Sequence, residues 1–184
     1  MSGFTIELIK PGENIMLEPG QQAPEFTSIN QDEKPVSLSD FKGRNLVLYF
    51  YPRDDTPGCT TEGIDFSGLT GEFEQANTIV IGVSKDSAIK HQKFIKKRDL
   101  KIDLLADIEG EICEAYGTWG EKQFMGKHFM GIVRSTFIID ISGKLAEVQY
   151  KVRVKGHAQA ILERVREINQ NARYSSGHTI QYLT

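Results

Sequence analysis

Cysteine is scarce in this 184-residue chain, which contains only Cys59 and Cys113. Two cysteines so far apart in sequence cannot form the dense disulfide framework that stabilises small secreted domains. The sequence also lacks CxxC and HExxH motifs and any close cluster of cysteine and histidine. These absences exclude the usual zinc-binding patterns, and we therefore expect no metal site.

Long apolar runs and a strong net charge are absent as well. No segment approaches the about 18 apolar residues that a membrane-spanning helix needs. Glu7 and Pro11 interrupt the apolar stretch that a signal peptide requires. We therefore expect a cytoplasmic protein that does not bind membranes. The 22 basic and 25 acidic residues give a net charge of −3, which argues against nucleic-acid binding through phosphate neutralisation.

The remaining pattern alternates between strands and helices. Near-continuous apolar runs predict buried strands at residues 45–52, 78–84 and 102–107. Apolar residues at helical spacing predict helices at residues 59–76, 86–100, 108–117 and 157–172. Turn residues between apolar segments predict hairpins at residues 23–37 and 132–152, and a helical turn at Leu38–Phe41. Residues 119–131 are punctuated by glycine and are interpreted as a loop.

This order of elements predicts an α/β protein with a thioredoxin-like fold. Helices would flank a central mixed β-sheet, and a β-hairpin would precede it at the N-terminus. We expect one domain at residues 21–172, with an N-terminal leader at residues 1–20 and a C-terminal tail at residues 173–184. A chain of this length can bury a sufficient core without disulfides or metals.

The segment "YPRDDTPGCTTE", Tyr51–Glu62, places Cys59 where a predicted buried strand turns into a helix. The carboxyl ends of parallel strands often carry the function of α/β folds. A thiol in the first turn of a helix faces the positive end of the helix dipole, which favours the nucleophilic thiolate. Thr56 can cap this helix or direct its hydroxyl towards the sulfur, and Pro52 can cover the sulfur. The alternative is a cysteine that packs as a small apolar residue.

The spacing Pro52-x-x-x-Thr56-x-x-Cys59 matches the signature of the peroxiredoxins. The wider string "YPRDDTPGCTTEGIDF" resembles the bacterioferritin comigratory protein, or Q-type, subfamily, and so does the later segment "YGTWGEKQFMGKHFMGIVRSTFIID". The resemblance extends over about residues 20–170. It implies a thiol-dependent peroxidase that reduces hydrogen peroxide and organic hydroperoxides without a cofactor or metal.

The resemblance also implies roles for five residues. Cys59 would attack the peroxide and become a sulfenic acid. Thr56 would hold the sulfur and a peroxide oxygen, and Pro52 would shield the sulfur. Arg134 would stabilise the thiolate and the charge of the transition state, and Glu62 would orient Arg134. Without the resemblance, the sequence predicts an exposed strand position for Arg134 and a carboxylate that complements the helix dipole for Glu62.

The sequence offers no obvious partner for oxidised Cys59. Relatives carry a resolving cysteine five residues after the attacking one, where this chain has Ile64, or in the helix at residues 86–98, which has none here. We therefore favour a one-cysteine cycle, in which an external thiol on a small molecule or a thioredoxin-like reductase reduces the sulfenic acid. The alternatives are a two-cysteine cycle resolved by Cys113 and a non-catalytic thioredoxin-fold interaction module.

The remaining side chains receive no catalytic role. We expect surface or capping positions for all four histidines, His91, His128, His157 and His178. Trp119 and Phe124 are expected to pack over the core, with the entrance for peroxide as the alternative. As in the family that the sequence resembles, we expect a monomer or a weak homodimer.

Overall fold

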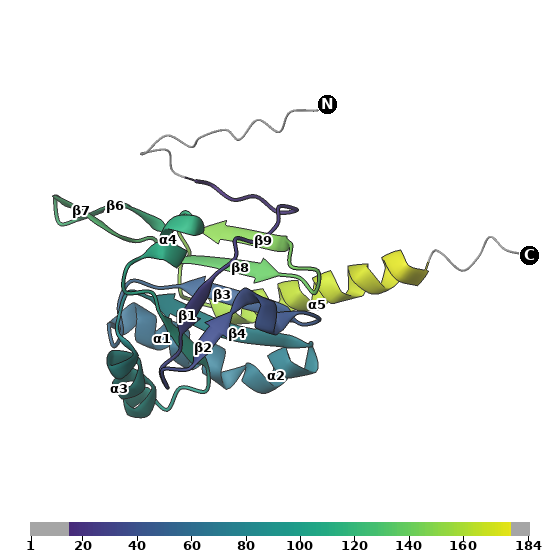
Figure 1. The fold of residues 1–184 in the computed structure, drawn as a ribbon, viewed down its shortest axis with the longest axis horizontal. Coiled ribbons are helices and arrows are strands. Elements are labelled where there is room, and N and C mark those ends of the chain that lie inside the picture. The colour runs from purple at the N-terminus through teal and green to yellow at the C-terminus, as the bar shows by residue number, and fades with distance from the viewer. Residues whose placement is uncertain (1–14, 178–184) are drawn as a thin grey trace, which may run out of the picture.

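A five-stranded mixed sheet forms the centre of the computed structural model, which describes residues 15–177 (Figure 1). Its strands are, in spatial order, β5 (Asp103–Ala106), β4 (Thr78–Ser84), β3 (Asn45–Phe50), β8 (Ser135–Ile139) and β9 (Leu145–Tyr150). The first three strands run parallel, and β8 is antiparallel to both β3 and β9. This arrangement confirms the predicted α/β fold with a central mixed sheet.

The central strand β3 is buried on both of its faces. Side chains alternate along a strand, so Leu46, Leu48 and Phe50 contribute to one core cluster and Val47 and Tyr49 to the other. All six residues of the strand are buried. The near-continuous apolar run in the sequence therefore reflects two packed layers, as is usual for the parallel part of a sheet.

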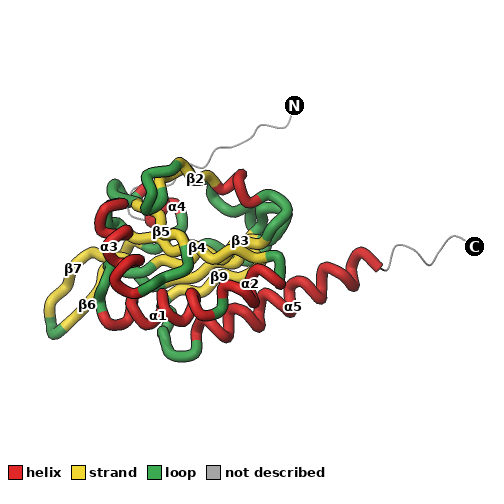
Figure 2. The backbone as a smooth tube through the Cα atoms, turned by 90° about the horizontal axis from the view of Figure 1, so that it is seen from below, coloured by secondary structure: helices red, strands yellow, loops and turns green. Residues whose placement is uncertain are grey.

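Helices cover the face of the sheet that carries Val47 and Tyr49 (Figure 2). They are α1 (Pro57–Gly68), α2 (Thr70–Gln75), α3 (Ala88–Arg98) and α5 (His157–Gly177). Each contributes buried apolar side chains to the same cluster, among them Phe66, Phe73, Phe94 and Leu162. The helix predicted at residues 59–76 is thus two helices, because the chain turns at Leu69 (φ −108°, ψ 4°) between two glycine-containing segments.

The N-terminal hairpin and a short helix cover the opposite face. These elements are β1 (Thr27–Ile29), β2 (Pro35–Ser37), the 3₁₀ turn η1 (Leu38–Phe41) and α4 (Glu111–Ala115). Tyr116, directly after α4, is fully buried in this layer and packs edge-on against Phe137 at a centroid distance of 5.1 Å. The predicted hairpin, helical turn and closing hairpin of β8 and β9 are all confirmed.

The prediction of a loop at residues 119–131 was wrong, since this segment forms a hairpin. Strands β6 (Trp119–Phe124) and β7 (Lys127–Ile132) pair with each other and extend away from the central sheet (Figure 1). Met125 and Gly126 both have positive φ, as a two-residue type I′ turn requires. A half-buried strand is recognised in a sequence by alternating apolar and polar residues. Glycines and exposed apolar residues interrupt this alternation here, so the strands were not predicted. Trp119 packs against the core, whereas Phe124 near the turn is 67% exposed.

We predict that Gly82→Ala lowers the free energy of unfolding by about 1–3 kcal/mol, because the new methyl group overpacks the core. A Cβ at this position of β4 would lie 2.7 Å from Leu104 Cδ2 and 2.8 Å from Tyr49 Cζ, and both side chains are buried. Urea denaturation measures the change. The control is Gly71→Ala in α2, where a Cβ meets nothing within 4 Å and alanine should raise stability by up to about 1 kcal/mol. Equal effects of the two substitutions would contradict the prediction.

The stability of the protein should also fall in acid because of His157 at the start of α5. Its side chain is buried, with Nε2 2.8 Å from Thr136 Oγ1, and burial together with Arg134 lowers the pKa of His157 to about 4. The unfolded chain binds this proton near pH 6.5, so the contribution is complete above that pH and is lost towards about pH 4. Between about pH 7 and about pH 4.5, the wild type should lose about 2 kcal/mol more unfolding free energy than His157→Gln. If urea denaturation showed the same loss of unfolding free energy in the wild type and in His157→Gln, the assignment of this pH dependence to His157 would be refuted.

Candidate active site

Cys59 lies in the first turn of α1, directly after the loop at residues 51–56 that follows β3, here called the Cys59 loop. Thr56 is the N-cap of α1, with an extended backbone (φ −86°, ψ 156°), and Pro57 is the first helical residue. Proline fits this position because its missing N–H would have no partner inside the helix. Cys59 is only 2% exposed, so its sulfur meets the free N–H groups of the helix end with little competing water.

Arg134 reaches this sulfur from a distant part of the chain. Phe50, the last residue of β3, pairs with Ser135 of β8, so Arg134 lies at the edge of the sheet where the Cys59 loop begins. Its Nη2 lies 3.5 Å from Cys59 Sγ. A Cβ on Gly58 would stand 3.2 Å from the same nitrogen, and glycine therefore leaves room for this approach.

Glu62 holds the other side of the guanidinium. Its Oε2 accepts a hydrogen bond from Arg134 Nη1 in an ion pair, and the carboxylate is only 1% exposed. Burial raises the pKa of Glu62 to about 7, although Arg134 opposes the rise. Its Oε1 is buried without a hydrogen-bond partner among the described residues. The pair fixes the direction of the arginine fork next to the sulfur.

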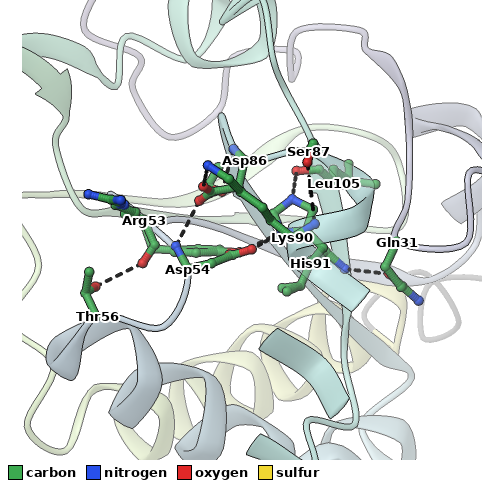
Figure 3. Close-up of polar contacts among 12 residues, drawn as sticks. Gln31, Arg53, Asp54, Thr56, Asp86, Ser87, Lys90, His91 and Leu105 are labelled. Atoms are coloured by element: carbon green, nitrogen blue, oxygen red, sulfur yellow. Dashed lines mark hydrogen bonds and ion pairs between the residues drawn. The ribbon is translucent and has the colours of Figure 1, made fainter. Parts of the chain in front are cut away.

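Thr56 and Pro52 border the same loop but make different contacts from those expected. The Thr56 hydroxyl donates to the Arg53 carbonyl oxygen at 2.9 Å rather than to Cys59 (Figure 3). Both Thr56 and Pro52 are half-buried. The structure therefore brings Arg134 into contact with both Cys59 and Glu62, and it leaves Thr56 and Pro52 in the adjoining loop.

Two further side chains feel the charges of this cluster and are not singled out by the sequence. Lys122 of β6 donates from Nζ to the Ile132 carbonyl oxygen at 2.9 Å. Burial and Arg134 lower the pKa of Lys122, while Cys59 opposes the change. Burial, followed by the charges of Glu62 and Cys59, raises the pKa of Tyr49 well above its ordinary value. Lys122 reaches this cluster because residues 119–131 form a hairpin, whereas their sequence predicts a loop.

The second cysteine, Cys113, lies on the opposite face of the central sheet. It is fully buried in the cluster of Leu46, Leu48 and Phe50, whereas Cys59 belongs to the cluster of the other face. Its backbone N–H donates to Asp107 Oδ2 at 2.8 Å. Burial, and then Asp107, raises the pKa of the Cys113 thiol far above its usual value. Cys113 is therefore an unreactive core residue in this conformation.

The position five residues after Cys59 is occupied by Ile64, which is 47% exposed on α1. The expectation of surface or capping positions was wrong for His91 and His157, which are 0% and 7% exposed. His128 is exposed, and His178 lies outside the described residues.

No three His, Cys, Asp or Glu side chains within residues 15–177 come together in a way that could hold a metal ion. None of the helices described for this chain combines the length and hydrophobicity that crossing a bilayer requires.

A family model and two curated relatives assign this chain to the same protein family. The AhpC/TSA family model matches residues 19–148. Peroxiredoxin Bcp of Bacillus subtilis is 44% identical over 156 residues, which cover 85% of this chain and 99% of the relative. Peroxiredoxin Bcp of Escherichia coli K12 is 38% identical over 151 residues, or 82% of this chain and 97% of the relative.

A solved structure agrees with these sequence matches. The bacterioferritin comigratory protein of Xanthomonas campestris, which has alkyl peroxide reduction activity, superposes with a TM-score of 0.76 at 34% identity. The match covers 85% of this chain and 99% of that one. The predicted thioredoxin-like fold and the predicted subfamily are both confirmed. This chain belongs to the AhpC/TSA family and, within it, to the peroxiredoxins of the bacterioferritin comigratory protein type, which are thiol-dependent peroxidases.

Proposed function

We propose that the protein reduces hydrogen peroxide and organic hydroperoxides by attack of the Cys59 thiolate and that an external thiol recycles it. The observation that carries this proposal is the 3.5 Å contact of Arg134 Nη2 with Cys59 Sγ at the start of α1. A permanently charged guanidinium and the helix dipole both favour a negative sulfur over a neutral thiol. The thiolate is the form that reacts with peroxides.

In the first half-reaction, the sulfur lone pair forms a bond to one peroxide oxygen while the O–O bond breaks. The bonding electrons leave with the second oxygen, which takes up a proton and departs as water or an alcohol. Cys59 is oxidised to the sulfenic acid and the peroxide is reduced. Negative charge moves from sulfur to oxygen, and Arg134 stabilises it along this path. Glu62 positions the arginine through their ion pair.

Thr56 and Pro52 are proposed to shape the place of the peroxide. The Thr56 hydroxyl proton is engaged by Arg53, so its oxygen lone pairs are available to accept the O–H of a hydroperoxide. Pro52 has no N–H to compete for the substrate and shields the sulfur from water. The alkyl peroxide reduction activity of the Xanthomonas campestris relative supports organic hydroperoxides as substrates beside hydrogen peroxide.

In the second half-reaction, an external thiolate attacks the sulfenic sulfur and hydroxide leaves as water. A second thiol then releases Cys59 from the mixed disulfide. Two observations support this one-cysteine cycle over resolution by Cys113. Ile64 occupies the position of the nearby resolving cysteine, and Cys113 lies in the core cluster of the opposite sheet face. A disulfide needs Cα atoms within about 7 Å, so resolution by Cys113 would demand local unfolding. The reductant is proposed to be a small thiol or a thioredoxin-like protein.

We predict that Cys59→Ser abolishes peroxide consumption, whereas Cys113→Ser retains it. Serine is a far weaker nucleophile than a thiolate, and we expect a loss of at least about a thousandfold. The assay follows peroxide in the presence of dithiothreitol. Cys113→Ser is the matched control, since it makes the same atomic change in the other cysteine. Equal consumption by both variants would show that Cys59 is not the attacking residue.

The recycling route should be visible in the intact mass after treatment with one equivalent of hydrogen peroxide. A one-cysteine cycle predicts a gain of one oxygen on Cys59, which a small added thiol converts into a mixed disulfide. An intramolecular bond between Cys59 and Cys113 would instead remove two hydrogens, and the mass gain of one oxygen would be absent before any thiol is added. The same treatment of Cys113→Ser should give the wild-type pattern. Quantitative formation of the internal disulfide would overturn the one-cysteine cycle.

A further inference from the structure

A largely buried polar cluster around Asp54 anchors the Cys59 loop (Figure 3). Asp54 is at its centre and is fixed through three atoms. Its Oδ1 accepts from the Tyr51 hydroxyl at 2.6 Å, its Oδ2 lies 2.8 Å from His91 Nδ1, and its backbone N–H donates to Asp86 Oδ2 at 2.8 Å. His91, on α3, is fully buried. The loop is thus tied to α3 by a contact that water does not reach.

The hydrogen bonds of His91 determine where its protons are. Nε2 lies 3.0 Å from the Leu105 carbonyl oxygen, which can only accept, so Nε2 carries a proton. The contact between Nδ1 and Asp54 Oδ2 also needs a proton, because otherwise two lone pairs would face each other at 2.8 Å. We assign this second proton to Nδ1, as the donor of the hydrogen bond to the Asp54 carboxylate. The geometry describes an imidazolium paired with a carboxylate.

The groups around the pair are consistent with this charge state. Tyr51 donates to Asp54 from the end of β3. Asp86, after β4, is neutralised by Lys90 of α3, whose Nζ lies 3.5 Å from Oδ1, and it accepts from Ser84 Oγ at 2.9 Å. Every charge near His91 therefore has its own partner, and the pair of His91 and Asp54 is neutral as a whole. A buried pair of this kind contributes a fixed geometry more than it contributes stability.

Residues 55–58 connect Asp54 to Cys59, so the position of Asp54 constrains the position of Cys59. Asp55 adopts a left-handed backbone (φ 59°) that turns the chain towards α1. The Thr56 carbonyl oxygen then accepts the N–H of Thr60 at 2.8 Å and so begins the helix that carries Cys59. The only other ion pairs of this turn join Asp55 to Lys97 and Arg98 within the described residues, and they are solvent-exposed. Exposed pairs constrain geometry weakly.

We propose that His91 is a positioning residue for the peroxidase reaction. Through the hydrogen bond from Nδ1 to Asp54, it fixes the Cys59 loop and the first turn of α1, and thereby the approach of Cys59 to Arg134. The inference rests on the proposed role of Cys59 as the attacking sulfur. His91 touches no reacting atom and acts only through Asp54.

Two substitutions separate the two hydrogen bonds of His91. In His91→Asn, the side-chain amide takes the place of Nδ1 and can still donate to Asp54. In His91→Gln, it takes the place of Nε2, reaches Leu105 and leaves the Asp54 carboxylate without its partner. We expect His91→Gln to lower the second-order rate constant of Cys59 oxidation about tenfold to a hundredfold, as misplacement of a reacting group does. His91→Asn should stay within about threefold of the wild type.

The measurement is the rate of oxygen addition to Cys59 by mass spectrometry, with the unfolding free energy of each variant determined in urea. Asp54→Asn alone should lower the rate of Cys59 oxidation. Added to His91→Gln, it should lower this rate little further. A purely structural histidine would lower the stability of both His91 variants without separating their oxidation rates, and this result would overturn the proposal. This result differs from a failure of the proposed function itself. If Cys59 were not the attacking residue, Cys59→Ser would still consume peroxide and wild-type Cys59 would gain no oxygen.

A second measurement needs no substitution and applies should His91→Gln fail to fold. Nitrogen-15 spectra of histidine-labelled wild-type protein near neutral pH should show both ring nitrogens of His91 bonded to protons. A ring whose Nδ1 carried no proton would contradict the hydrogen bond to Asp54 and, with it, the proposal.

Discussion

The contact between the Arg134 guanidinium and the Cys59 sulfur is the interaction on which the rest of the site depends. It joins residues 75 positions apart, and several independent features of the fold are needed to make it. The register of β3 with β8 sets Arg134 beside the start of the Cys59 loop. Gly58 leaves space for the side chain, and Glu62 holds its fork from the opposite side. A charged group that is 15% exposed acts on the sulfur with little solvent screening.

The central sheet also separates the two thiols of the chain. On one face, Cys59 meets a helix end and a cation, which are the conditions for a reactive thiolate. On the other face, Cys113 meets apolar side chains and the Asp107 carboxylate, which keep it neutral. Both sulfurs are buried, so burial alone does not explain why the reactivity is proposed for Cys59 and not for Cys113. What differs is the sign of the charge that each sulfur faces.

The Cys59 loop is held from two sides, and this explains how a nearly buried thiol can keep a defined geometry. Arg134 and Glu62 define the position of the sulfur on the helix side. Asp54 fixes the other end of the loop through Tyr51, His91 and Asp86. Tyr51 also packs the start of the loop into the core beside Tyr49 and Phe94, and the polar contacts of Asp54 fix the chain that follows it. Helix α3, which the family resemblance connected only with a missing cysteine, here supplies one of them.

The sequence by itself determined the elements with strong periodicity and the local setting of Cys59. Buried strands, amphipathic helices and the Pro52–Cys59 spacing are properties of neighbouring residues, and local patterns predict them. Only the tertiary structure decided that Lys122 lies on a hairpin, that His91 is buried against Asp54, and that the two cysteines occupy opposite faces. The residues alone predicted only a carboxylate that complements a helix dipole at Glu62, the family resemblance implied its contact with Arg134, and the structure shows their ion pair. Each of these facts depends on strand register and on the stacking of layers, which bring together residues far apart in the chain and leave no periodic trace in the sequence.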